Sequence, residues 1–184
     1  MSRFLLLYSS FDGQAEKITR RMGGVLTRQG HSVTLASADA TGAFDRLGMH
    51  DAVLIGAAVR VGRYSRTLES QVKKHRDFLA SMPNAFFSVC LAAAGPRAKR
   101  EAWETPLRNF CARTGWQPQR CATFAGALRY SRYNPFIRLM MRFIVSRAGG
   151  DTDWSRDYEY TDWAAVDGFA AELARTLVPH AQAA

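Results

Sequence analysis

One continuous stretch near the N-terminus reads Phe4-Leu5-Leu6-Leu7-Tyr8-Ser9-Ser10-Phe11-Asp12-Gly13-Gln14-Ala15, an apolar run followed by a loop of small and polar residues. An uninterrupted apolar run is typical of a strand that is buried on both faces of a parallel sheet. Apolar residues then recur at helical spacing from Ile18 to Leu26, and Gly30 ends that pattern. The stretch therefore predicts a strand, a loop and the N-terminus of a helix.

The same alternation of short apolar runs and helical patterns continues along the chain. Further strands are expected at 33–36, 52–58, 85–92 and 121–128, and helices around 68–79, 103–111 and 163–177. Such alternation predicts an α/β fold, a parallel sheet with helices on both faces. Five strands suit a doubly wound sheet of order 2-1-3-4-5, in which ligands bind beyond the carboxyl ends of the first and third strands.

Length and composition indicate one globular domain over residues 1–184. The chain is 47% apolar and 22% charged, which excludes an intrinsically disordered protein. Its apolar runs fall short of the roughly 20 residues that span a bilayer. Cys90, Cys111 and Cys121 cannot all pair and lack metal-site spacing, so a reduced, cytoplasmic setting without a metal site is expected.

Positive charge is concentrated in one part of the chain. The net charge is +9, and 17 of the 25 Lys and Arg residues, but only 4 of the 16 Asp and Glu residues, lie between Arg60 and Arg147. Such a region suits nucleic acid, an anionic membrane or an anionic small molecule, while a generally basic solvated surface is the plainer alternative. Nucleic acid is not favoured, because aromatic residues are not interleaved with the basic ones and no recognition motif is present.

The loop Ser9–Ala15 has the composition of an anion-binding site. Small and polar residues at a helix N-terminus present free backbone N–H groups and the positive end of the helix dipole, which suits a phosphate. The alternative is that Ser10 or Asp12 simply caps the helix. The loop matches neither the Walker pattern nor the glycine-rich dinucleotide fingerprint.

A long insertion, about 129–162, separates the fifth predicted strand from the last helix. Connections in such folds usually take about 2–6 residues, so a longer excursion suggests a function. An amphipathic helix is expected from Asn134 to Gly150, too short to span a bilayer but long enough to lie in its interface. An extra helix packed on the core is the alternative. The residues expected to face the membrane are Phe136, Ile137, Arg138, Met140, Met141, Arg142, Phe143 and Ile144.

Taken in order, several stretches resemble a flavodoxin and, more narrowly, the quinone-dependent, flavodoxin-type protoporphyrinogen dehydrogenases of haem biosynthesis. The matching stretches are Ser9–Gln14, Ile55–Tyr64, Val72–His75, Ser81–Pro83, Gly126–Tyr133, Gly149–Asp153 and Tyr160–Trp163. They cover nearly the whole chain. The resemblance implies a flavodoxin-like fold with FMN as cofactor.

The resemblance also implies where FMN would bind. Its phosphate would lie at Ser10–Ala15, although Asp12 and Ala15 stand where the flavodoxin loop has threonines. Its ring would lie between the loops 58–64 and 92–100, with Tyr64 stacking on it and Gly62 allowing close approach. The implied cofactor-binding residues are Ser9, Ser10, Phe11, Asp12, Gly13, Gln14, Ala15, Ala58, Arg60, Gly62, Tyr64, Ala92, Ala93, Ala94 and Gly95.

The activity that the resemblance implies is oxidation of protoporphyrinogen IX to protoporphyrin IX, with electrons passed to a membrane quinone, menaquinone or ubiquinone. Arg63, Arg129 and Arg132 are candidates for binding the substrate propionates. The protein would work in the cytoplasm, peripherally bound to the inner face of the cell membrane. The alternatives are a flavodoxin-type electron shuttle and a non-enzymatic regulatory or nucleic-acid-binding domain.

Overall fold

The computed structural model describes residues 1–94, 100–132, 153 and 155–177. The strands are β1 (Arg3–Ser9), β2 (Ser32–Ser37), β3 (Ala52–Ala58), β4 (Asn84–Val89), β5 (Arg120–Phe124), β6 (Ala127–Leu128) and β7 (Tyr158–Glu159). The α-helices are α1 (Gln14–Arg28), α2 (Arg66–Lys74), α3 (Arg76–Ser81), α4 (Arg100–Thr114) and α6 (Trp163–Thr176). Short 3-10 turns lie at η1 (Phe44–Met49), η2 (Leu91–Ala93) and η3 (Tyr130–Arg132).

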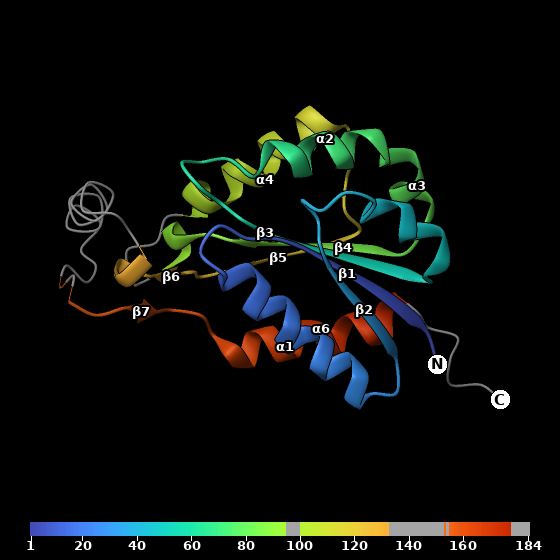
Figure 1. The fold of residues 1–184 in the computed structure, drawn as a ribbon, viewed down its shortest axis with the longest axis horizontal. Helices are drawn as coiled ribbons and strands as arrows, with labels where there is room; N and C mark the ends of the chain where they lie inside the picture. Colours follow the sequence, from blue (N-terminus) through green and yellow to red (C-terminus); the bar gives the residue numbers. More distant parts are fainter. Residues whose placement is uncertain (95–99, 133–152, 154, 178–184) are drawn as a thin grey trace.

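The main sheet has five parallel strands in the order β2-β1-β3-β4-β5, which confirms the predicted order. Helices α1 and α6 cover one face of this sheet, and α2, α3 and α4 cover the other (Figure 1). The small strands β6 and β7 lie at one end of the sheet, and the N-terminus lies at the opposite end (Figure 1). The carboxyl ends of the strands, where ligands bind in doubly wound folds, therefore share an edge with β6 and β7.

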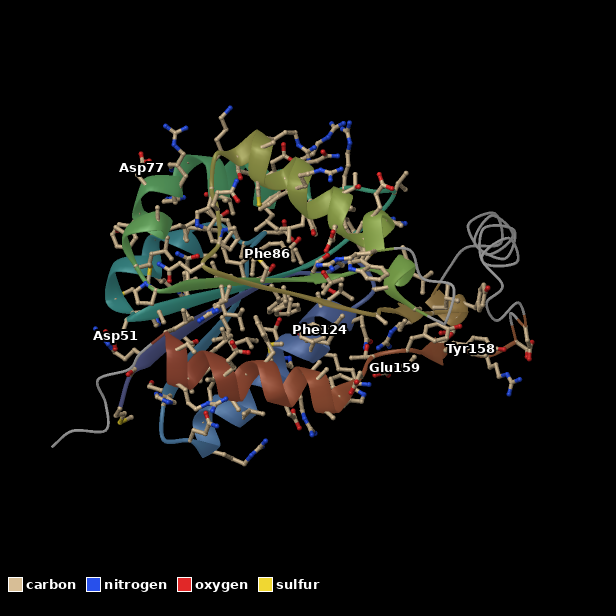
Figure 2. The ribbon with its side chains drawn as sticks, turned by 180° about the vertical axis from the view of Figure 1, so that it is seen from behind. Asp51, Asp77, Phe86, Phe124, Tyr158 and Glu159 are labelled. Atoms are coloured by element: carbon tan, nitrogen blue, oxygen red, sulfur yellow. The ribbon has the colours of Figure 1, made fainter. Side chains whose placement is uncertain are left out.

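Alternate residues of each central strand serve two separate cores, one on each face of the sheet. Phe4 and Leu6 of β1 pack with α1 and α6, whereas Leu5 and Leu7 pack with α2 and α4. Phe124 and Phe86 lie on these two opposite faces (Figure 2). This period of two, with every position buried, explains why β1 appears in the sequence as an uninterrupted apolar run.

The end of the fifth strand differs from the expectation. The apolar run 121–128 predicts one strand, but β5 ends at Phe124 and the chain turns before Ala127. Gly126 lies at this turn, packed near the Val89 side chain and the Leu91 backbone. Beyond it, β6 pairs antiparallel with β7, which returns from the far end of the insertion. A two-stranded ribbon therefore closes the base of the insertion.

The helical pattern over 68–79 also resolves into two helices rather than one. Helix α2 ends at Lys74 and α3 begins at Arg76, with His75 between them. The His75 ring bonds back through Nδ1 to the Gln71 carbonyl at 2.9 Å, and it stacks on Phe44 of η1. Cys121 is exposed on edge strand β5, whereas Cys90 and Cys111 are buried. Within the described ranges, the helices are too short or too polar for any of them to cross a bilayer.

Candidate functional site

The loop after β1 presents an uncapped helix N-terminus. The N-cap of α1 is Gly13, whose φ of 84° lies in the left-handed region that glycine tolerates and whose hydrogen side chain caps nothing. The N-cap position therefore falls on neither Ser10 nor Asp12, and the Ser10 hydroxyl makes no capping hydrogen bond. The first N–H groups of α1 stay available for an anion, and the helix dipole favours negative charge there.

Ser10 carries a hydroxyl without a partner in this loop. Its Oγ is buried and makes no hydrogen bond within the structure. A buried polar atom left unpaired costs about 1–3 kcal/mol, so a bound phosphate oxygen would relieve that cost. The residues present therefore fit the phosphate of FMN, by the unpartnered Ser10 hydroxyl and the uncapped N-terminus of α1.

Ser9 has a different role from Ser10. Its hydroxyl donates to Oδ2 of Asp39 at 2.8 Å, and the hydroxyl of Ser65 donates to Oδ1 of the same carboxylate at 2.6 Å. Ser65 in turn caps α2 through the Leu68 N–H. Asp39, which sequence reasoning missed, therefore ties the ends of β1 and β2 to the start of α2 and fixes the position of the loop.

The loop after β3 forms a tight hairpin. Arg60 and Arg63 exchange two backbone hydrogen bonds of 2.8 and 3.1 Å around Val61 and Gly62. Both central residues have positive φ, 50° for Val61 and 71° for Gly62, as the primed hairpin turns require. The Arg60 guanidinium lies 5.2 Å from the centre of the Phe11 ring, so this hairpin contacts the loop after β1.

The Tyr64 ring is a core element, which corrects the expectation that it stacks on a flavin. The residue is only 4% exposed, and its ring packs edge-on against Phe86 and Phe110. Its hydroxyl donates to Ser88 Oγ at 2.9 Å, and burial raises the pKa of this phenol. Both faces of the ring are thereby committed to the protein. The neighbouring Phe11 and Val61, 42% and 90% exposed, are the apolar side chains that reach solvent here.

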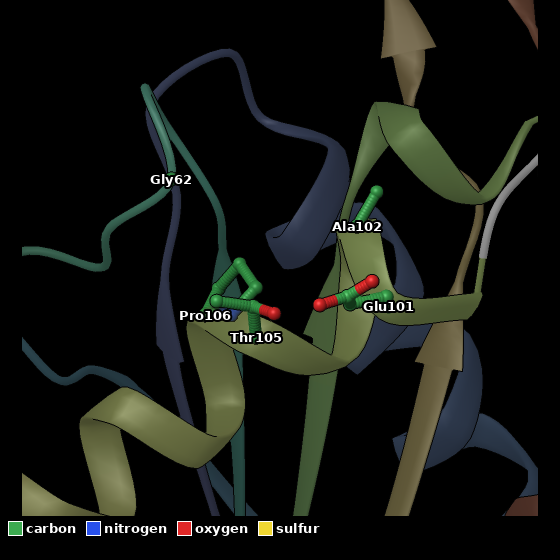
Figure 3. Close-up of a pocket in the computed structure, with 5 residues that line it drawn as sticks. All are labelled: Gly62, Glu101, Ala102, Thr105 and Pro106. Carbon is green, nitrogen blue, oxygen red and sulfur yellow. The ribbon is translucent and has the colours of Figure 1, made fainter.

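An open pocket of about 380 Å³ lies between this hairpin and the start of α4 (Figure 3). Gly62 forms one wall, and Glu101, Ala102, Thr105 and Pro106 of α4 form the other. Ala58 is half-buried at the end of β3. After β4, Ala92 and Ala93 belong to the 3-10 turn η2, and Ala94 follows it. The pocket therefore borders the loop 58–64 through Gly62, and its other wall is the start of α4, which follows the loop 92–100 in sequence.

Gln14 connects the phosphate loop to the base of the insertion. It is 4% exposed, and its Nε2 donates to Thr161 Oγ1 at 2.8 Å and to Glu159 Oε1 at 3.2 Å. The Thr161 hydroxyl in turn donates a hydrogen bond to the Ala125 carbonyl at 2.8 Å. Glu159 is also paired with Lys17 at 2.7 Å. Glu159 is the last residue of β7, and Figure 2 shows it between Tyr158 and the start of α6.

Arg129 completes this network. Its Nη2 donates to Gln14 Oε1 at 3.0 Å, while its Nε is buried and has no hydrogen-bond partner. Burial alone would raise the pKa of Glu159, but hydrogen bonds from Lys17 and Gln14, together with the charges of Lys17 and Arg129, lower it. Glu159 is therefore held as a carboxylate. Of the three arginines expected to bind substrate, Arg129 is the one seen at the phosphate loop.

The other expected site residues fall into two groups. Arg63 is exposed on the hairpin after β3. Arg132 is the last residue of η3, and the substrate contact expected of its side chain lies outside what the structure describes. Gly95 and all the residues expected to face the membrane also lie outside the described residues. No cluster of three or more metal-ligating side chains occurs within 1–94, 100–132, 153 and 155–177.

Comparisons with known proteins agree with this arrangement. The model of a flavodoxin-domain family matches residues 5–155. The chain is 38% identical over 170 residues to protoporphyrinogen IX dehydrogenase (quinone) of Escherichia coli K12, covering 92% of this chain and 93% of that one. It is 37% identical over 174 residues to the enzyme of the same name from Leishmania major, covering 92% of this chain and 74% of the other.

Solved structures show the same fold. Oxidised flavodoxin 1 from Bacillus cereus superposes with a TM-score of 0.55 over 96% of this chain and 99% of its own, at 14% sequence identity. At that identity the likeness establishes the architecture alone.

Proposed function

Because this chain belongs to the flavodoxin-domain family and, within it, to the quinone-dependent protoporphyrinogen IX dehydrogenases, we infer that it oxidises protoporphyrinogen IX to protoporphyrin IX. FMN is its cofactor and a quinone its electron acceptor. When bound, FMN takes two electrons per turnover from the porphyrinogen and delivers them to the quinone. The complete reaction removes six electrons and six protons from the substrate, so three quinones become three quinols.

One structural observation carries this proposal: the uncapped N-terminus of α1 beside the buried, unpartnered Ser10 hydroxyl. We assign the FMN phosphate to the loop Ser10–Ala15, where backbone N–H groups and this hydroxyl donate to it. The ring is assigned to the region between Ala58–Tyr64 and Ala92–Gly95. The pocket between Gly62 and α4 supports the side of this placement that lies at Ala58–Tyr64.

The positive side chains near this edge suit an anionic substrate. Arg60 and Arg63 are exposed on the hairpin that borders the pocket. A guanidinium binds a carboxylate through two parallel hydrogen bonds, which orients as well as attracts the propionates. We assign propionate binding to Arg63, and to Arg132 from its place at the start of the insertion. We assign Arg60 to cofactor binding, because its guanidinium lies over the ring of Phe11 in the loop after β1.

We also propose that the protein works in the cytoplasm, bound peripherally to the inner face of the membrane that holds the quinone. The sequence of the insertion supports this, because Phe136–Ile144 combines apolar residues with Arg138 and Arg142. The concentration of basic residues between Arg60 and Arg147 favours an anionic surface as well. A single domain over residues 1–184 stays our prediction for the organisation of the chain.

An anaerobic assay of porphyrin formation tests the proposed activity. The purified, FMN-loaded protein is mixed with protoporphyrinogen IX and a quinone, and porphyrin fluorescence is followed. Controls omit FMN, quinone or protein, because porphyrinogens also oxidise spontaneously. Fluorescence that rises only in the complete mixture is the expected result. Bound flavin without porphyrin formation would favour an electron shuttle, and failure to bind flavin would contradict the flavoprotein assignment itself.

A further inference from the structure

Two of the buried polar atoms that lack a partner lie at the same place in the fold. The described part of the chain holds four such side-chain atoms, namely Ser10 Oγ, His31 Nδ1, Trp116 Nε1 and Arg129 Nε. Ser10 belongs to the loop before α1, and Arg129 is bonded to Gln14, the first residue of α1. Two donors, one in the loop before α1 and one bonded to the first residue of α1, are thus left unused in a buried setting, which is unfavourable unless a ligand accepts from them.

Arg129 is held in place rather than swinging freely. Its Nη2 is fixed on the Gln14 amide, and that amide is itself fixed by Thr161 and Glu159. Among the described carboxylates, none forms an ion pair with Arg129, although the charge of Glu159 acts on it from nearby. Lys17 instead neutralises Glu159 directly at 2.7 Å. The positive charge of Arg129 therefore remains available to an anion.

From these contacts we propose that Arg129 binds the phosphate of FMN, donating from its unpartnered Nε edge. The proposal rests on the proposed function, since it requires FMN at the loop Ser10–Ala15, and it reassigns Arg129 from the substrate to the cofactor. The arginine adds a fixed positive charge to a site otherwise made of backbone N–H groups and one hydroxyl. Because Arg129 is the first residue after β6, the base of the insertion also becomes part of the cofactor site.

Comparing FMN with riboflavin tests this directly, because the two flavins differ only by the phosphate. Dissociation constants are measured by flavin fluorescence quenching for the wild type, Arg129→Met, Arg129→Lys and the control Arg21→Met. Arg21 is an exposed arginine of α1 that pairs with Asp167 of α6, so its replacement removes the same charge without exposing a carboxylate in the first turn of α1. We expect Arg129→Met to weaken FMN binding by about 10- to 100-fold, the range for a hydrogen bond to a charged group.

The expected pattern has three further parts. Riboflavin affinity stays within about twofold of the wild type in every variant, since the lost interaction is with the phosphate. Arg129→Lys, which keeps the charge but not the planar fork, gives intermediate FMN affinity. Raising the salt concentration weakens FMN binding more in the wild type than in Arg129→Met, because screening acts on the charge that the variant lacks.

The other outcomes separate the possible failures. Equal loss of FMN and riboflavin binding would overturn the proposal, since Arg129 would then merely shape the loop. Unchanged FMN affinity with a raised KM for protoporphyrinogen would also overturn it and return Arg129 to the substrate. Circular dichroism checks that each variant is folded. If Arg129→Met does not fold, the FMN and riboflavin affinities of Arg129→Lys decide between these outcomes. A wild type that binds neither flavin would refute the proposed function instead.

Discussion

Val61 holds an unfavourable backbone conformation at the edge of the candidate site. Its φ of 50° belongs to the left-handed region, which a β-branched residue rarely adopts. Such a conformation costs about 1–3 kcal/mol and persists only where the surroundings impose it. Here the two Arg60–Arg63 hydrogen bonds impose it, while the side chain is 90% exposed and gains little from packing. The strain is thus a local cost of bringing this hairpin to the pocket.

We predict that Val61→Gly raises the thermal stability of the protein. Glycine adopts positive φ without steric conflict, so the variant should be more stable by about 1 kcal/mol. Val61→Asn should share part of the gain, because asparagine tolerates this region, whereas Val61→Ala, which keeps a Cβ, should gain less. Thermal unfolding of the four proteins without flavin measures the order. A midpoint lower in Val61→Gly than in the wild type would contradict this account of the hairpin.

At the scale of elements, a glycine on β3 makes room for an aromatic ring on the neighbouring strand β4. Gly56 lies opposite Phe87 in the parallel register, and the Phe87 ring fills the space where a Gly56 side chain would stand. Phe87 is fully buried in the core under α1 and α6. The absence of a side chain at position 56 is therefore what lets this aromatic ring pack against the centre of the sheet.

We expect Gly56→Ala to destabilise the protein strongly. The new methyl group would overlap the Phe87 ring, and forcing an extra carbon into a packed core costs about 1–3 kcal/mol or more. Gly24→Ala is the matched control, because its Cβ meets Arg28 at an ordinary 3.5 Å in the middle of α1. That control should gain about 0.5–1 kcal/mol from the better helix propensity of alanine. Urea unfolding reports both changes, and losses of equal size would contradict the packing argument.

At the scale of the whole molecule, the candidate cofactor site and the base of the insertion, formed by β6 and β7, share one end of the sheet (Figure 1). The ribbon of β6 and β7 joins them, since Gln14, Arg129 and Glu159 form one hydrogen-bonded group. A protein that docks on a membrane through the insertion would thereby bring its cofactor site close to a lipid-soluble quinone.

The membrane proposal predicts the behaviour of a deletion variant. Removing Pro135–Arg147 should abolish sedimentation with vesicles rich in anionic phospholipid and should lower turnover with a long-chain, lipid-embedded quinone. Turnover with a short-chain, water-soluble quinone should change little, because the loop that holds the phosphate is untouched. Vesicles of neutral phospholipid are the control for charge. If the deletion left both sedimentation and turnover with the embedded quinone intact, the proposal would be wrong.

Local patterns in the sequence were sufficient to predict the main sheet. Continuous apolar runs and helical spacing predicted five parallel strands in the observed order, because burial on both faces leaves a direct mark on composition. The loop Ser9–Ala15 was predicted at the end of β1 because small and polar residues replace the apolar run there. The split of α2 from α3 was not predicted, since the bond from His75 to Gln71 leaves no break in the apolar spacing.

Contacts between distant residues were decided by the tertiary structure alone. Gln14 meets Arg129 and Glu159 across 115 and 145 positions of sequence, and no local pattern reports such a meeting. The burial of Tyr64 depends likewise on Phe86 and Phe110, which approach it from β4 and α4. The sequence by itself determined which segments form the five-stranded sheet and which loop we propose for an anion, because periodicity and small polar residues act locally. Which side chains complete that site depended on how the chain folds back on itself.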